Sequence, residues 1–388
     1  MSTTGREAEG ARERTRRAGG GPDLAGSGAE AADAIARAVL YEGHILWPYR
    51  RSALKNRQRW TFGGVYPETW SARGHPDDPS RMRTQCLVRA GPGARVDVHV
   101  RFLHIVERQA ARVEDDGADL TFVDRLDVAG ERHLSWTEAT EREVVATGLE
   151  LGTLATDDGF RRRFLIDSGR ETEWLTDGSG ERVGALVRRW RALRGTLSVR
   201  AEPLPDRLFR LSVEVENDSP WRATVPSARA ADDRPSSPAL RSDGRRADAQ
   251  RSSFVSLHAV LRVEDGEFVS LMDPPARLAV AAAACDNRGW WPVLVGDDGA
   301  RDTMLASPII LYDHPRLAPE SPGDLFDSAE IDQLLILNVL SLTAEEKREM
   351  RASDPRAREI LDRCGDLSPE QLMRLHGAIR SLRPAKER

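Results

Sequence analysis

The sequence predicts an α+β protein: an antiparallel β core made of hairpins, with a short N-terminal helix and a C-terminal helical unit. Two observations predict this fold class. Apolar and polar residues alternate with a period of two around 96–102, 209–216 and 255–263, as they do in strands that bury one face. Beyond residue 327, helix-start patterns recur at short intervals instead, which is typical of short helices packed together.

The N-terminal helix is expected to begin near residue 27. Ser27 and Glu30 have the spacing of a capping box, and Ile35 and Val39 lie about one turn apart on one helix face. Residues 1–26 are rich in Gly, Arg and Glu and contain almost no large apolar groups. Because burial cannot offset the entropy of ordering such a segment, we predict that it is a disordered tail.

Three β-hairpins are predicted in the middle of the chain, each from two alternating segments with a turn between them. They run from about 84 to 103, from 197 to 216 and from 255 to 272. Their turns lie at Gly91-Pro92-Gly93, at Pro203–Asp206 and at Asp265-Gly266. Strands are also predicted at 120–128 and 163–166, and the pattern at 183–193 fits both a helix and a strand.

Composition divides the chain into segments. Residues 27–275 form the N-terminal helix and the β-rich domain, 276–326 form a connector, and 327–388 form the helical unit. Within the domain, residues 219–252 contain four prolines, several serines and mixed charge, which predicts a flexible insertion. The helical unit has four helix-start patterns. They begin at Asp327, Thr343, Asp354 and Ser368.

Charge and cysteine content exclude several classes of protein. The 388 residues carry a net charge of -5, which argues against a general binder of nucleic acid or anionic membranes. The three cysteines, Cys86, Cys285 and Cys364, are too few for a disulfide framework, so a reducing cytoplasm is predicted. No apolar run is long enough to cross a bilayer, and no membrane span is predicted.

Local motifs for metals, phosphates and serine nucleophiles are absent from the sequence. The eight histidines show no His-x-x-x-His spacing, and the cysteines show no Cys-x-x-Cys spacing. Spacing therefore predicts no metal site and no cofactor, although a metal site assembled from distant residues stays open. The glycine pairs match neither a P-loop nor a dinucleotide fingerprint.

Cys285 is the one candidate nucleophile. It follows an apolar run and precedes Asp286 and Asn287. A thiol at a strand end beside such groups, with His314 as a base, could act as an activated thiolate. The alternative is a small buried residue followed by a turn at 286–289. The sequence leaves both interpretations open, and with them the question of whether the protein is an enzyme.

The segment from Tyr41 to Gly64 combines aromatic rings, cations, an amide and paired glycines. Only three of the 57 basic residues in the chain are lysines, and Lys55 is one of them. The mixture suits a partner-binding surface, because Trp, Tyr and Arg dominate the energetics of protein interfaces. Equally, the rings could dock the first helix onto the sheet while the cations reach solvent. The candidate partner-binding residues are Trp47, Tyr49, Arg50, Lys55, Asn56, Arg57, Arg59 and Trp60.

A second candidate for partner contact is the proline-rich stretch from Ser307 to Asp324. Its prolines limit the backbone conformations available to it, and such stiff segments often lie across a domain surface. Glu320 and Asp324 are its candidate partner-binding residues. The acidic residues that follow, Asp327 and Glu330, are explained as a helix cap.

Two long phrases of the sequence resemble an uncharacterised family. One runs from Tyr41-Glu42-Gly43 through Lys55-Asn56-Arg57 to Arg59-Trp60-Thr61-Phe62-Gly63, and the other from Ser307-Pro308-Ile309-Ile310-Leu311-Tyr312-Asp313 to Asp324-Leu325-Phe326-Asp327. The family that they resemble is encoded among nickel–iron hydrogenase structural and maturation genes, notably in actinobacteria with oxygen-tolerant, high-affinity uptake enzymes. The similarity covers residues 30–380 apart from 219–252.

The resemblance implies a cytoplasmic accessory protein for assembly or maturation of a nickel–iron hydrogenase, acting by contact with hydrogenase subunits or maturation factors. Two alternatives stay open: a cysteine-dependent enzyme centred on Cys285, and a structural subunit of a hydrogenase complex. The chain lacks the nickel-binding histidine clusters and cysteine motifs of the well-known maturation factors. The resemblance therefore does not imply direct metal delivery.

Overall fold

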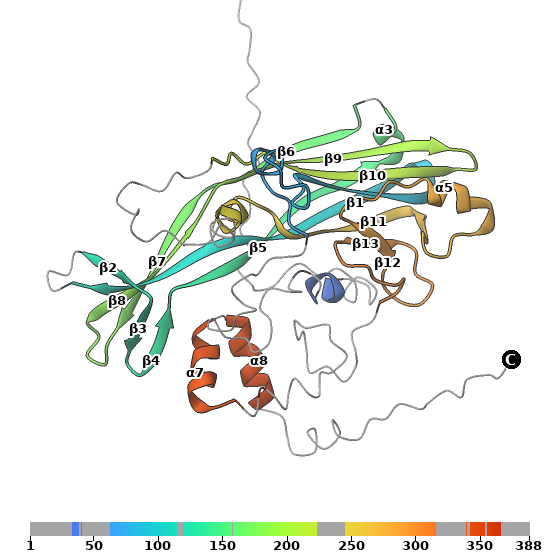
Figure 1. The fold of residues 1–388 in the computed structure, drawn as a ribbon. Coiled ribbons are helices and arrows are strands. Elements are labelled where there is room, and N and C mark those ends of the chain that lie inside the picture. Colours follow the sequence, from blue (N-terminus) through green and yellow to red (C-terminus); the bar gives the residue numbers. More distant parts are fainter. Residues whose placement is uncertain are drawn as a thin grey trace, which may run out of the picture.

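A computed structural model describes residues 33–38, 40, 63–114, 119–156, 158–222, 245–315, 339, 342–353 and 355–365. The described chain is mostly antiparallel β sheet with few helices, which confirms a β-rich α+β fold. Figure 1 shows most strands gathered into one large curved sheet, with the helices α7 and α8 beside it. No helix among the described residues is both long and apolar enough to span a membrane.

The large sheet contains eleven strands, and two further strands pair only with each other. In chain order the strands are β1 (Arg81–Val113), β2 (Leu120–Val123), β3 (Arg125–Val128), β4 (Glu131–Leu134), β5 (Trp136–Glu150), β6 (Phe160–Ile166), β7 (Gly169–Thr176), β8 (Arg182–Trp190), β9 (Leu193–Leu204), β10 (Leu208–Asn217), β11 (Val255–Val269), β12 (Trp291–Leu294) and β13 (Thr303–Ser307). The helices are α2 (Glu68–Ser71), α3 (Leu151–Leu154), η3 (Ala276–Leu278), α5 (Ala279–Ala283), α7 (Ala344–Ser353) and α8 (Pro355–Gly365). Residues 33–38 are also helical, within the predicted first helix.

The main path through the sheet is β12-β13-β11-β1-β10-β9-β6, and β1 organises it by changing neighbours along its length. The first part of β1 pairs with β10 and β11, its middle with β11 and β5, and its end with β8 and β2. The pairing with β11 shifts register between Ala90 and Arg95, where the sequence is Gly91-Pro92-Gly93-Ala94. Extra residues on one strand bend a strand pair, so both parts of β1 can face one core.

The main core lies inside this bend. Alternate residues from both parts of β1, such as Cys86 and Val98, are fully buried in one cluster with side chains of β9, β10 and β11. Phe102 and Phe254 meet in it with ring centroids 4.7 Å apart. Complete burial of a side chain of this size contributes about 1.5–3 kcal/mol. The alternating pattern that predicted the strands therefore also supplies the apolar area that holds the sheet together.

The second predicted hairpin is confirmed, because β9 and β10 pair directly across a short turn. The first and third are wrong as hairpins: residues 87–90 pair with 266–269, and residues 95–103 pair with 255–264. The two strand segments of each predicted hairpin thus pair with those of the other predicted hairpin. Alternation identifies the buried residues of a strand but not its neighbour, and the predicted turns act as bends in two long strands.

Other predicted strands are present, with different boundaries. β6 contains the predicted strand at 163–166, and the segment at 120–128 forms two strands, β2 and β3. The ambiguous segment at 183–193 is a strand, since β8 covers most of it and β9 begins at its end. Its apolar residues satisfy the helical spacing as well, so only its pairing with β1 and β7 separates the two interpretations.

The described parts of the predicted insertion and connector include buried residues, a helix and two strands. Ser219 and Trp221, inside the predicted insertion, are buried, and residues 245–250 are helical; residues 223–244 lie outside the described residues. The connector predicted at 276–326 contributes β12 and β13 to the main sheet. Strands of four and five residues are too short to give a clear periodic pattern, which explains why they were not predicted.

One end of the sheet forms a separate region, which we call the arm. It consists of the end of β1 (Glu107–Val113) and the start of β5 (Trp136–Glu138) with β2, β7 and β8, together with the β3–β4 pair; the rest of the sheet is the body. In Figure 1 these strands lie away from β6, β9 and β12.

The helix α7 contacts the arm, where Arg132 of β4 pairs with Glu345. The capping box predicted at its start is confirmed, because the Thr343 backbone N–H donates to Glu346 Oε2 at 2.8 Å and the Glu346 backbone N–H to Thr343 Oγ1 at 3.2 Å. The next helix begins at Pro355, as predicted. The helix starts predicted at Asp327 and Ser368 lie outside the described residues.

Candidate functional site

The predicted partner-binding residues all lie outside the described residues. They are Trp47, Tyr49, Arg50, Lys55, Asn56, Arg57, Arg59, Trp60, Glu320 and Asp324. The structure does describe the residues that border both groups: 33–38 and Gly63 flank the first, and 307–315 precede the second. These bordering residues show where the two phrases enter the described structure.

Gly63 and Pro308 bring the two segments into contact. Gly63 has a φ of +56°, and a Cβ at this position would lie 2.6 Å from Pro308 Cγ. The Gly63 carbonyl accepts a hydrogen bond of 3.0 Å from the Leu257 backbone N–H. The backbone conformation and the close approach both require glycine here. Gly63, the first of the paired glycines, thus brings the end of one phrase against the start of the other.

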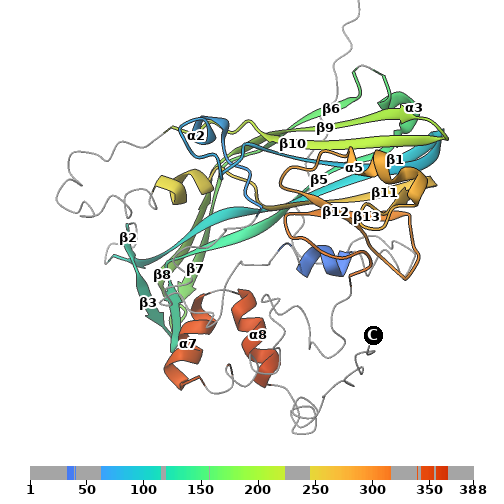
Figure 2. The same cartoon turned by 45° about the vertical axis from the view of Figure 1, so that its right-hand side comes forward.

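Residues 307–314, which we call the strap, alternate between partly buried and exposed side chains from Ile309 to Tyr312. Ile309 and Leu311 pack against a cluster that contains Ile35 of the first helix and Val293 of β12. The first helix lies close to β12 and β13 in Figure 2. Ile310 and Tyr312 face the other way and are 70% and 81% exposed. Such exposure is unusual for large apolar side chains in one segment.

Hydrogen bonds hold both ends of the strap. At its start, Ser307 Oγ donates to the Ile309 carbonyl at 2.7 Å. At its end, the Leu294 backbone N–H donates to Asp313 Oδ1 at 2.8 Å, and the His314 backbone N–H donates to the Leu294 carbonyl at 2.7 Å. The hydroxyl of Ser270 donates to the other oxygen of Asp313. The backbone that carries the exposed side chains is therefore held between these anchors, which lowers the entropy cost of binding.

Trp291 lies beside the start of the strap. It begins β12, pairs with Ser307 and is partly exposed. Its neighbour Pro292 lacks an N–H and so limits strand addition at this edge of the sheet. We call Trp291, Ile310 and Tyr312 the strap surface. An exposed Trp, Tyr and Ile on a fixed backbone can act as anchors for a protein partner.

Sequence reasoning noted the strap but did not select these three residues. The signal that could have selected Ile310 and Tyr312 is the uninterrupted apolar run at 309–312. In a proline-flanked segment, such a run places apolar side chains on both sides. When one side of a segment is buried and the other faces solvent, apolar residues are needed only on the buried side. The second apolar side therefore indicates contact with something else.

The surroundings of Cys285 fit the structural interpretation of this residue. Its thiol lies 3.6 Å from the Ala281 carbonyl, among apolar side chains that include Leu87 and Leu278. Burial raises the pKa of the Cys285 thiol, and the positive charge of Arg210 opposes that shift only in part. A raised pKa lowers the thiolate fraction at neutral pH, which is the opposite of what an activated nucleophile needs.

The groups predicted to act with this thiol have other contacts. Asn287 Oδ1 accepts hydrogen bonds of 2.8 Å from Thr84 Oγ1 and from the Gln85 backbone N–H. The carboxylate of Asp286 pairs with Arg83 and Arg288. The segment 286–289 thereby extends the sheet beside the start of β1, because Arg83 and Arg288 also exchange backbone hydrogen bonds. His314 belongs to the strap, where its backbone bonds to β12.

Two histidines are buried in the sheet, which sequence reasoning did not single out. Burial together with the nearby charge of Arg142 lowers the pKa of His104 to about 3, and a hydrogen bond with the backbone of Arg191 opposes this shift only in part. Burial also lowers the pKa of His258 to about 4. Both rings are therefore neutral at physiological pH. Within the described ranges, no group of three or more His, Cys, Asp and Glu is arranged to hold a metal ion.

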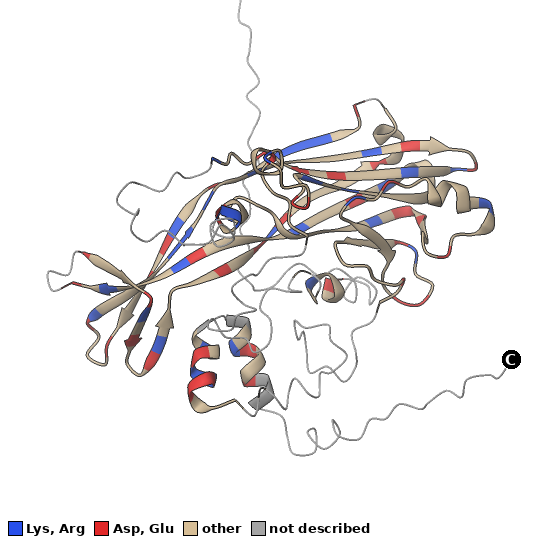
Figure 3. Ribbon diagram, viewed as in Figure 1, with Lys and Arg blue, Asp and Glu red and all other residues tan. Residues whose placement is uncertain are grey.

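Acidic and basic side chains are interspersed along the strands of the body, as Figure 3 shows. The ion pairs there include Arg101 with Glu143 and Arg210 with Glu202. Charges of both signs thus occur along the described strands of the body, whereas the strap surface is distinguished by its apolar side chains. A comparison of the chain with protein-family models found no match, and a comparison with curated proteins found none either.

Proposed function

We propose that the protein is a cytoplasmic accessory protein for assembly or maturation of a nickel–iron hydrogenase, and that it acts by binding a hydrogenase subunit or maturation factor through the strap surface. The context comes from the two sequence phrases that resemble the hydrogenase-associated family. The observation that carries the proposal is the contact of Gly63 with Pro308, because it joins the two phrases at one place.

This contact makes a shared site the simplest account of both phrases. Trp60 is three residues from Gly63 along the chain, and Glu320 is six residues from His314. A chain spans at most about 3.5 Å per residue, so Trp60 and Glu320 can reach the strap. Ile310 and Tyr312 supply exposed apolar area at the junction, and the first phrase is rich in cations whereas the second carries carboxylates. Apolar anchors with a polar rim are typical of specific protein interfaces.

The test is co-purification from cells that express the neighbouring hydrogenase genes. Tagged wild-type protein should retain a hydrogenase subunit or maturation factor, and the variant with Ile310→Asp and Tyr312→Asp should retain at least tenfold less. The matched control is Val280→Asp on α5, since Val280 is equally exposed but lies elsewhere on the body. The control should retain the partner as wild type does.

A second variant examines the first phrase. Reversal of charge at Lys55 and Arg57 should also weaken co-purification and reduce hydrogenase activity. If both this variant and the strap variant retain partner and activity in full, the proposed surface is wrong. Presence of the protein in the mature enzyme at one copy per hydrogenase would identify it as a structural subunit, whereas an accessory protein leaves before the enzyme is active.

A further inference from the structure

The arm exposes two large aromatic side chains on one face of its sheet. Phe122 of β2 is 42% exposed and Trp174 of β7 is 41% exposed. Both residues belong to a single row across four strands, because Phe122 pairs with Ala111, Ala111 with Ala185, and Ala185 with Trp174. Cross-strand partners point to the same side of a sheet. The two rings therefore lie on one face, which we call the outer face of the arm.

The residues between the two rings are small and covered. Ala111 and Ala185 have no exposed surface, and neither does their neighbour Val187. Three spacings between adjacent strands separate β2 from β7, about 14 Å in all. Because the alanines are covered, the exposed part of this face is formed by the aromatic rings and the arginines around them.

Arginine side chains accompany both rings. The guanidinium of Arg189 lies 5.1 Å from the centre of the Phe122 ring, and that of Arg182 lies 4.9 Å from the Trp174 ring. Arg170 pairs with Arg189 across the strands and so shares the outer face. Among the described residues, neither Arg170 nor Arg182 makes an ion pair. Stacked arginines keep their N–H groups free to bind carboxylates.

The carboxylates of the arm lie mainly elsewhere. Among the described strand residues that point to the outer face, Glu107 is the one acidic residue, and it is paired with Arg251 at 2.7 Å. Glu138 and Glu173 face the opposite side, where they pair with Arg188. The outer face is therefore positive and aromatic, although the whole chain carries a net charge of -5.

We propose that the outer face of the arm is a docking site for an extended acidic segment of a partner protein, with apolar side chains that contact Phe122 and Trp174. Complementary charge favours this partner, because Arg170, Arg182 and Arg189 can bind its carboxylates. A polypeptide fits better than a nucleic acid, since the negative net charge of the chain repels a long polyanion. This inference does not depend on the proposed function, because it concerns a different surface.

The test uses the full-length protein and fluorescein-labelled peptides in a fluorescence-anisotropy titration. The probe is a short peptide of glutamates with two phenylalanines, and its reference is the same peptide with glutamine in place of glutamate. We expect the acidic peptide to bind at least tenfold more tightly than the neutral one. High salt should weaken binding of the acidic peptide, as it does for exposed charge pairs.

Variants on the two surfaces locate the binding site. The pair Arg170→Glu and Arg182→Glu should weaken binding at least tenfold, as should the pair Phe122→Ala and Trp174→Ala. Trp174→Phe should retain most of the affinity. The matched control is Arg163→Glu with Leu165→Ala on β6, an exposed arginine and an exposed apolar residue on another strand. Circular dichroism and the melting temperature show whether each variant is folded.

Three outcomes would overturn the proposal. One is no difference between the acidic and the neutral peptide. Another is equal loss of affinity in the β6 control and in the outer-face variants. The third is tighter binding of a labelled single-stranded oligothymidine than of the acidic peptide, which would identify the face as a nucleic-acid surface instead.

Discussion

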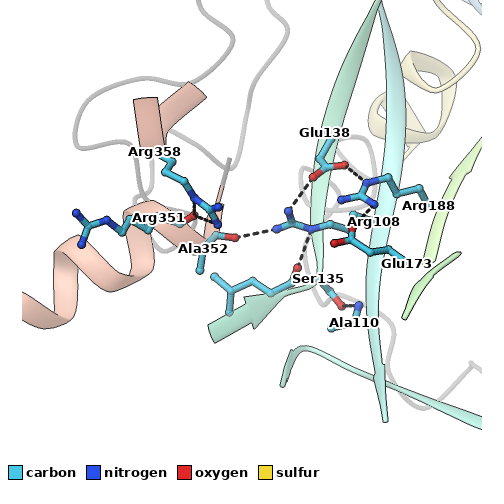
Figure 4. Close-up of polar contacts among 10 residues, drawn as sticks. Arg108, Ala110, Ser135, Glu138, Glu173, Arg188, Arg351, Ala352 and Arg358 are labelled. Carbon is cyan, nitrogen blue, oxygen red and sulfur yellow. Dashed lines mark hydrogen bonds and ion pairs between the residues drawn. The ribbon is translucent and has the colours of Figure 1, made fainter. Parts of the chain in front are cut away.

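In the body of the sheet, side chains such as Leu211 and Phe102 are buried against other apolar side chains, whereas the arm buries charged groups. Arg108 and Glu138 are both buried and pair at 2.7 Å. Figure 4 shows Arg108 between Glu138 and the carbonyl of Ala352 in α7, to which it donates a hydrogen bond of 2.8 Å. Arg188 bonds to the second oxygen of Glu138 at 2.8 Å.

This difference implies that the two regions respond differently to substitution. An apolar core tolerates changes that conserve volume, because its contacts have little directional preference. A buried ion pair tolerates almost none, since removal of one partner leaves the other charged and buried. The stability of the arm should therefore depend on the chemistry of a few residues. The stability of the body should depend on the total volume of many apolar side chains.

The largest effect is expected from Glu138→Ala. It leaves Arg108 and Arg188 without their shared carboxylate and should lower the free energy of unfolding by about 3–5 kcal/mol. Guanidinium denaturation measures the loss, and faster hydrogen exchange in α7 would show that the Ala352 contact loosens. The control is the double change Arg108→Met and Glu138→Leu, which should cost much less. Equal losses in both variants would mean that the lost hydrogen bonds of this network, and not an unpaired buried charge, explain the effect.

The matching change in the body is Leu211→Ala. It should cost about 2–5 kcal/mol through lost burial and a remaining cavity, whereas Leu211→Met should cost less than about 1.5 kcal/mol. The same denaturation experiment measures both. At Glu138 the near-isosteric change to Gln removes the charge, so it should cost more than Leu211→Met. The reverse order would contradict the comparison between body and arm.

Acid should destabilise the protein through His104 and His258. Both pKa values are lowered in the folded state, to about 3 and about 4, so the unfolded chain binds more protons below its ordinary histidine pKa. Their contribution is fully present above about pH 6.5 and is lost as the pH falls toward 4, at about 1.4 kcal/mol per pH unit for each histidine. Unfolding free energies measured between pH 7 and 4 test this, and His104→Leu should reduce the slope.

The smallest effect is expected at the helical unit. Thr343→Ala removes the hydroxyl that accepts from the Glu346 backbone N–H and should cost about 1 kcal/mol. Thr343→Ser keeps the hydroxyl and should cost little. Hydrogen exchange at the first turn of α7 is the suitable measurement. A loss comparable with that of Glu138→Ala would show that α7 contributes more to the arm than its contacts indicate.

Much of the body could be predicted from the sequence, because the alternation around Val98 and Val213 reports burial directly. Strand pairing could not be predicted, since the bends at Gly91-Pro92-Gly93 and Asp265-Gly266 have the residues of turns. For the strap surface, the sequence indicated the proline-rich segment that contains Ile310 and Tyr312 but not the exposed side chains themselves. The outer face of the arm was missed because Phe122 and Trp174 are far apart in sequence and meet only through the pairing of four strands.

β1 passes from the body into the arm without a break. From Arg95 to Val113 a strand extends on the order of 60 Å, and it is hydrogen-bonded to neighbours at both ends. A backbone of this kind resists bending within its plane and acts as a rigid spacer. Two molecules bound at its opposite ends would be kept at a set separation, so the protein could align one with the other without any moving part.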